Sequence, residues 1–98
     1  MVDRPDRDPG RGVYGITTAA ELAGVSASTL RLYEQNGLIT PDRTEGGTRR
    51  FSDDDLDRLH HIGELVAMGI NLAGIARILE LETDNRRLRS RLEGTERT

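Results

Sequence analysis

Two short helix-forming stretches separated by one glycine constrain the fold of this chain most strongly. The first opens with the capping-box spacing of Thr18 and Glu21, and Gly24 ends it. Ser26 is a favoured helix N-cap for a second stretch that runs to about Asn36. Two short helices joined by so tight a turn predict a helix-turn-helix. A chain of 98 residues has room for one small domain around it.

A glycine pair marks a hairpin after the second stretch. Gly46 and Gly47 lie at the centre of residues 42–51, which predicts two short strands joined by a turn. Three arginines flank the pair, namely Arg43, Arg49 and Arg50. Arginine suits bidentate contact with phosphate, and glycine permits close backbone approach. The hairpin is therefore expected to form a wing that grips a phosphate backbone.

Two further helices are expected after the wing. Ser52 and Asp55 have capping-box spacing and open a third helix, which Gly69 ends. Its apolar residues recur at helical spacing, as in a helix with one buried face: Leu56, Leu59, Ile62, Leu65 and Val66. Asn71 caps a fourth helix, and no proline separates it from the residues that follow.

A stripe at alternating spacings of three and four residues continues from the fourth helix. Its members are Ile78, Leu81, Asn85, Leu88 and Leu92. Just over two heptads cannot make a stable isolated coiled coil, but they can suffice when packed against a second subunit. An asparagine within the stripe favours one register at a cost in stability. The stripe predicts a homodimer.

The order of these residues resembles the DNA-binding domain of the MerR family of bacterial transcription regulators. The family core reads roughly G-V-S-x-x-T-L-R-x-Y-E-x-x-G-L, then P-x-R, then G-x-R-x-[YF]. This chain matches from Gly24 to Leu38, at Pro41 and Arg43, and from Gly47 to Phe51. The resemblance implies a mainly α fold: a winged helix-turn-helix with a small β-hairpin wing and a C-terminal dimerisation helix. It also implies a dimer that binds an inverted-repeat operator in double-stranded DNA.

The resemblance further implies which residues contact DNA. It puts Arg31 against DNA and Tyr33 against a phosphate. Ala27 and Ser28 lie where base edges are usually reached, whereas Thr29 could be a local cap instead. The family often has Tyr at the position of Thr48, where this chain can offer only a hydroxyl. The expected set is Thr18, Ala27, Ser28, Thr29, Arg31, Tyr33, Arg43, Thr48, Arg49 and Arg50.

Within the family, the chain looks most like the HspR-type branch of heat-shock repressors. The shared segments are Ala19–Val25, the wing from Glu45 to Ser52, and the run from Asn71 to Leu81, which reads N-L-A-G-I-x-R-I-x-E-L. Members of this branch repress chaperone operons with a chaperone as corepressor. The resemblance implies a stress-response repressor with a chaperone as a candidate partner.

Four segments are expected along the chain. Residues 1–12 are charged, Pro- and Gly-rich and should form a flexible tail. A winged helix-turn-helix domain follows at 13–79, then a dimerisation helix at 80–94 and a tail at 95–98.

Composition excludes several other functions. The chain has no Cys, which rules out disulfides and thiolate metal sites. His60 and His61 are adjacent, so their side chains point about 100° apart on a helix and cannot chelate one ion together. No nucleophile–base set is present, so we expect neither an enzyme nor a cofactor. No apolar run approaches the length of a membrane span and no signal segment precedes the domain, so a cytoplasmic protein without a membrane partner is expected.

The net charge of −3 leaves two alternatives open. Residues 1–52 carry seven Arg against seven acids, and the acidic excess lies in residues 53–98. Local charge governs phosphate binding, so the sign of the whole chain is weak contrary evidence. One alternative is a DNA-architectural or excisionase-like winged-helix protein. The other is a protein-interaction module that has lost DNA binding.

Overall fold

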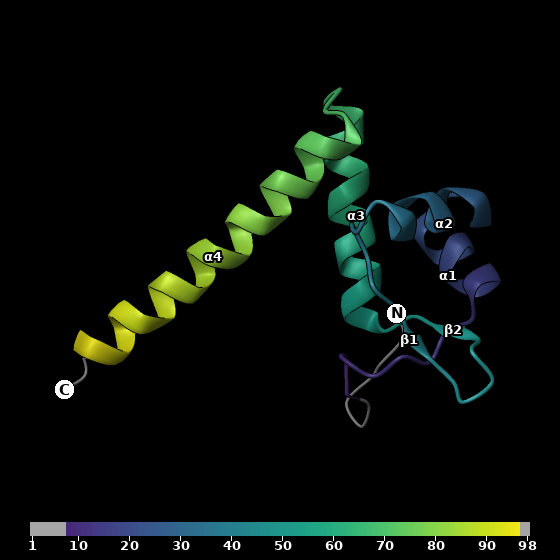
Figure 1. The fold of residues 1–98 in the computed structure, drawn as a ribbon, viewed down its shortest axis with the longest axis horizontal. Coiled ribbons are helices and arrows are strands. Elements are labelled where there is room, and N and C mark those ends of the chain that lie inside the picture. Colours follow the sequence, from purple (N-terminus) through teal and green to yellow (C-terminus); the bar gives the residue numbers. More distant parts are fainter. Residues whose placement is uncertain (1–7, 97–98) are drawn as a thin grey trace.

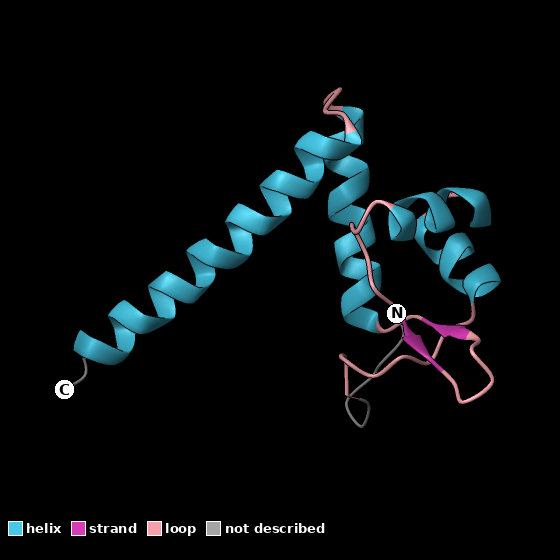
Figure 2. Cartoon of the chain, viewed as in Figure 1, coloured by secondary structure: helices cyan, strands magenta, loops and turns pink. Residues whose placement is uncertain are grey.

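A computed structural model describes residues 8–96, with side chains through residue 94. The described chain forms four helices and one hairpin, in the order α1 (Ile16–Ala23), α2 (Ala27–Gln35), β1 (Asp42–Arg43), β2 (Arg49–Arg50), α3 (Asp53–Ala67) and α4 (Leu72–Glu96). Figure 2 shows the hairpin below the helix pair α1–α2, with α3 between that pair and α4. The predicted mainly α fold with a small β wing is confirmed.

The first helix begins two residues before the predicted cap. Gly15 is its N-cap, has an extended backbone and supplies no side-chain cap. The capping box expected from Thr18 and Glu21 is therefore wrong. The reason lies just upstream, where Tyr14 forms an antiparallel bridge with Phe51 and the backbone turns directly from that bridge into the helix.

The turn between the helices follows the sequence prediction. Gly24 ends α1 with a φ of 73°, a left-handed conformation that glycine adopts without a Cβ clash. The Oγ of Ser26 accepts a hydrogen bond from the backbone N–H of Thr29 at 3.1 Å and so caps α2. Gly37, with a φ of 73°, follows the end of α2.

The core lies where α1, α2, α3 and the start of α4 meet. Its most deeply buried side chains are Leu30, Leu38, Ile39, Phe51, Ile62 and Ile75. The buried residues of α1 are both small, namely Ala19 and Ala20. Leu22, an apolar residue of α1, is 49% exposed, and Val66, predicted on the buried face of α3, is 43% exposed.

The segment before α1 is attached to the domain. Residues 1–7 of the predicted tail lie outside the described residues. The N–H of Gly12 donates to Asp42 Oδ2 at 3.0 Å, and the N–H of Asp54 donates to the carbonyl of Pro9 at 3.0 Å. A Cβ at Gly12 would lie 2.5 Å from the carbonyl oxygen of Arg50, so glycine alone allows this approach. The described part of the predicted tail, residues 8–12, is therefore attached to the folded domain.

The fourth helix runs away from the rest of the domain. Figure 1 shows α3 and α4 meeting at a turn and diverging, so that the C-terminal half of α4 stands clear of the other elements. Asn71 Oδ1 accepts from the N–H of Gly74 at 2.8 Å, as expected for a cap. Ile75 and Leu79 are buried, whereas no described side chain after Leu79 is. None of the helices in the described chain is both long and apolar enough to cross a membrane.

Candidate nucleic-acid interface

The second helix turns one face to the core and the other to solvent. Leu30 is fully buried, whereas Ser28, Arg31 and Leu32 are exposed. The guanidinium of Arg31 forms no hydrogen bond or ion pair within residues 8–96. Its donors are therefore free to meet an external acceptor, as a base-reading arginine requires.

Tyr33, which the resemblance puts against a phosphate, lies mostly in the core. The residue is only 6% exposed, and its ring belongs to the core. The hydroxyl makes no hydrogen bond within the described chain, yet no buried polar side-chain atom there lacks a partner. The hydroxyl must therefore reach the surface. Tyr33 can offer that one group to a ligand, but not the face of its ring.

The first turn of α2 combines capping with exposure. Thr29 Oγ1 lies 2.9 Å from Ser26 Oγ, so its hydroxyl takes part in the cap of α2. Ala27 is half-buried and Ser28 exposed beside it. Thr18 is exposed on α1. These small side chains leave the N-terminal end of α2 accessible.

The wing is a tight antiparallel hairpin. Asp42 pairs with Arg50, and Arg43 pairs with Arg49. At its turn the hydroxyl of Thr44 accepts from the N–H of Thr48 at 3.1 Å. Gly47 has a φ of 85°, which explains why a glycine is needed at this position of the turn. Thr48 is exposed at the tip.

An acid on α2, not predicted from the sequence, joins the wing to the helix. Glu34 Oε2 lies 2.9 Å from Arg43 Nη2, and its Oε1 lies 2.5 Å from Arg49 Nε. The hydrogen bond from Arg49 is the main reason that the pKa of Glu34 is lowered; partial burial opposes this shift, and the positive charges of both arginines reinforce it. Glu34 is part of the Y-E pair of the family pattern. The sequence did not reveal its partners, because they lie 9 and 15 residues away.

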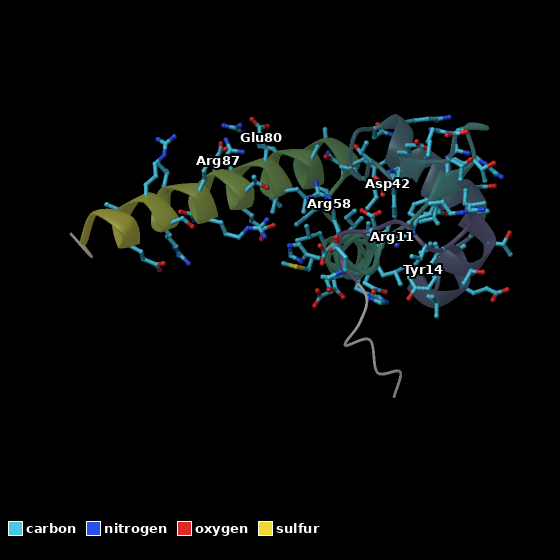
Figure 3. All side chains as sticks on the ribbon, turned by 90° about the horizontal axis from the view of Figure 1, so that it is seen from below. Arg11, Tyr14, Asp42, Arg58, Glu80 and Arg87 are labelled. Atoms are coloured by element: carbon cyan, nitrogen blue, oxygen red, sulfur yellow. The ribbon has the colours of Figure 1, made fainter. Side chains whose placement is uncertain are left out.

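Two other arginines in or near the wing, Arg50 and Arg58, donate hydrogen bonds to backbone carbonyls. Arg50 is half-buried and donates from Nη1 to the carbonyl of Arg49 at 3.1 Å. Arg58 of α3 donates from Nε to the carbonyl of Leu38 at 2.6 Å, which fastens the loop after α2. Figure 3 shows Arg58 between α4 and the domain, while Glu80 and Arg87 project from α4 itself. The Glu34 contacts join the wing to α2, and the Arg58 contact fastens the loop between them to α3.

Comparison with known proteins identifies this arrangement. A profile of MerR HTH family regulatory proteins matches residues 5–82. The chain belongs to the MerR family. It is 48% identical over 80 residues to a Streptomyces coelicolor protein that carries the name heat shock protein HspR, which covers 81% of this chain and 53% of that protein. The chain spans about half the length of the curated relatives it matches.

Solved MerR-family structures have the same fold. One is HiNmlR, described as a MerR family regulator lacking the sensor domain and bound to promoter DNA. It is 38% identical with a TM-score of 0.69 over 85% of this chain and 64% of that chain. Another is the N-terminal part of MtaN, a multidrug transporter activator of Bacillus subtilis. It is 28% identical with a TM-score of 0.65 over 88% of this chain and 97% of that chain.

Membership of the MerR family agrees with the expectation that the chain is not an enzyme, because the family consists of regulatory proteins.

The adjacent histidines contact different partners. His60 Nε2 lies 3.3 Å from the carbonyl oxygen of Leu22, and His61 Nε2 lies 2.9 Å from Glu82 Oε1 on α4. No group of three or more metal-ligating side chains comes together in the described part of the chain.

Proposed function

We propose that this MerR-family chain is a sequence-specific DNA-binding transcription regulator. The observation that carries the proposal is the exposed, unpaired Arg31 on α2 beside a wing whose arginines are fixed to the same helix by Glu34. A helix with a free arginine suits the major groove, and a cationic hairpin next to it suits the phosphate backbone. The likeness to a MerR-family structure bound to promoter DNA supports this function.

The proposed contacts divide into base readout and phosphate binding. Arg31 reads a base edge, and Ala27 and Ser28 permit close approach at the start of α2. The phosphate contacts come from short hydroxyl side chains and from the arginines of the wing. They are Thr18, Thr29, Tyr33 through its hydroxyl, Arg43, Thr48, Arg49 and Arg50.

The exposed leucines of α4 support a homodimer. Leu81, Leu88 and Leu92 are 48%, 56% and 63% exposed, a large apolar stripe for a small protein. Ile78 packs against the core of its own domain, so the free stripe begins at Leu81. Asn85, the polar member of the stripe, lines a polar cleft of about 840 Å³ between α3 and α4. Burying the stripe against a second copy would supply the two-fold symmetry that an inverted-repeat operator requires.

The similarity to HspR supports a repressor of the heat-shock or stress response. On this proposal the chain acts in the cytoplasm, where bacterial DNA is found, and a chaperone is its candidate corepressor. Chromatin immunoprecipitation from heat-shocked and unshocked cells tests the assignment. Occupancy next to chaperone operons that falls on heat shock is expected, and occupancy unrelated to stress genes would overturn the stress-response part.

Footprinting on a recovered site tests the mode of binding. We expect protection of one palindromic site and a steep fall in affinity as salt concentration rises. Extended protection over tandem sites would favour the architectural alternative. Binding too weak to show a salt dependence would favour the protein-interaction module.

A further inference from the structure

Glu34 faces one arginine from each strand of the wing. Each carboxylate oxygen takes a different guanidinium, Oε1 that of Arg49 and Oε2 that of Arg43. The Glu34 side chain is 20% exposed, so solvent only partly weakens these two contacts. A single carboxylate on α2 therefore fixes both edges of the hairpin relative to the helix.

The two arginines differ in which of their donors are already bonded. Arg43 donates from Nη1 to the carbonyl of Gly47 at 2.9 Å and from Nη2 to Glu34, so it spans the turn of the wing. Arg49 is bound to Glu34 through Nε, and its two terminal nitrogens have no partner within residues 8–96. An arginine held at Nε presents its terminal nitrogens in one direction, which suits bidentate contact with one phosphate.

The carboxylate also neutralises part of the positive charge of the wing. The pKa of Glu34 is lowered by the Arg49 hydrogen bond, so the group stays ionised at neutral pH. Non-specific binding to DNA depends almost entirely on phosphate neutralisation by free positive charges. An ionised acid between two wing arginines must therefore weaken contact with an arbitrary stretch of DNA.

We propose that Glu34 is a positioning residue that raises the DNA specificity of this protein by orienting Arg49 and Arg43 and offsetting their charge. The inference rests on the proposed function. At the correct site, preset arginines meet phosphates without losing further side-chain freedom. On other DNA the same carboxylate acts as a local repulsive charge, which is how specificity is raised against the wrong partner.

The test uses the full chain and a near-isosteric variant, Glu34→Gln, with Glu45→Gln as its matched control. Glu45 lies exposed in the wing turn, and its side chain forms no hydrogen bond or ion pair in the described chain. Glu45→Gln therefore removes the same charge as Glu34→Gln without breaking such a contact. The probes are a duplex selected by the wild-type chain from a random-sequence library and a scrambled duplex of the same composition. Affinity for each is measured over a range of salt concentrations, and circular dichroism verifies folding.

For Glu34→Gln we expect weaker binding to the selected duplex and tighter binding to the scrambled one. The ratio of the two affinities should fall by about tenfold, and the salt slope on scrambled DNA should steepen by about one unit. Glu45→Gln should tighten both and leave the ratio unchanged. If both variants change the ratio equally, or if Glu34→Gln weakens both duplexes by the same factor, Glu34 does not set specificity.

Glu34→Asp separates the effect of the negative charge from the effect of side-chain length. This variant also tests the proposal if Glu34→Gln does not fold. Aspartate keeps the negative charge but is too short to reach both arginines, so scrambled DNA should still bind weakly while the selected duplex loses affinity. Tighter binding of scrambled DNA by this variant would contradict the charge argument. A wild-type chain that prefers no sequence at all would refute the proposed function itself, before any variant is compared.

Discussion

Arg49 of β2 donates its Nε–H to Oε1 of Glu34 on α2 over 2.5 Å, and this contact joins the wing to the second helix. Arg43 adds a second contact to the other carboxylate oxygen at 2.9 Å. The consequence for stability depends on pH, because only the ionised carboxylate accepts both bonds. The pKa of Glu34 lies below its ordinary value of 4.5, chiefly through the Arg49 hydrogen bond.

Acid should remove the contribution of this cluster to folding. Since the pKa of Glu34 is lower in the folded than in the unfolded chain, its contribution is complete above the unfolded pKa and is lost as pH falls through the folded one. Glu34→Gln should therefore lower the free energy of unfolding most at neutral pH. Urea unfolding at about pH 7 and about pH 3 measures the difference, which should shrink at the lower pH. A difference that stays constant between these pH values would contradict the argument.

The capping box of α3 should contribute measurably to stability. Ser52 Oγ accepts from the N–H of Asp55 at 2.9 Å, and Asp55 Oδ2 accepts from the N–H of Ser52 at 2.9 Å. Ser52→Ala removes the cap from a buried position and should cost about 1 kcal/mol of unfolding free energy. Thermal and urea unfolding report it. Ser28→Ala, at an exposed position whose side chain forms no hydrogen bond in the described chain, should change stability by less than about 0.5 kcal/mol.

Local signals in the sequence predicted most of the elements. Ser26, Ser52 and Asn71 cap the helices at which the sequence put them, and Gly24 ends α1. These features depend on a few neighbouring residues, so they can be read without the tertiary structure. The wing likewise follows from its glycine pair.

Features that depend on distant packing could not be predicted in this way. Helix α1 starts earlier than the sequence predicted, because Tyr14 pairs with Phe51, 37 positions further along the chain. Tyr33 proved to be a core residue because helix spacing alone does not say how deep a side chain lies. No local signal in the sequence singles out Glu34, since its arginine partners approach only when the hairpin folds back on α2.

Arg31 is expected to discriminate between DNA sequences. Arg31→Ala should cost about 1–3 kcal/mol on a selected duplex and much less on a scrambled one, because a base contact is lost and not a phosphate contact. Arg77→Ala is the matched control, with the same charge change at an exposed position on α4. Fluorescence anisotropy with both duplexes measures the losses. Equal losses on the two duplexes would reassign Arg31 to the DNA backbone.

Arg49 is expected to bind a phosphate. Arg49→Ala should weaken binding to both the selected and the scrambled duplex, with the larger loss on the selected duplex where Glu34 presets the guanidinium, and should lower the salt slope by about one unit. Arg49→Lys keeps the charge, but a single ammonium cannot hold Glu34 and a phosphate in the fork geometry of arginine. The lysine variant should keep the salt slope and still lose affinity for the selected duplex. Unchanged affinity and slope in Arg49→Ala would remove this residue from the interface.

Dimerisation is expected to depend on the exposed leucines of α4. Truncation after Glu82 keeps the core residues Ile75 and Leu79 and the contact of Glu82 with His61, so the domain should remain folded. It removes Leu88 and Leu92, whose side chains are 56% and 63% exposed in the single subunit and so are not packed into its core. The truncated chain should therefore be monomeric and bind a full palindromic duplex poorly.

A point variant separates the apolar stripe from the length of the helix. Leu88→Glu places a charge on the stripe and should yield a monomer, because a buried carboxylate without a partner is costly. Arg87→Glu inserts the same side chain at the neighbouring exposed position and should leave the dimer intact. Analytical ultracentrifugation with and without the duplex compares the variants with the intact chain. An intact chain that sediments as a monomer in both conditions would show that the stripe does not pair two subunits. Two-fold symmetric binding to an inverted-repeat operator would then have no structural basis in this stripe.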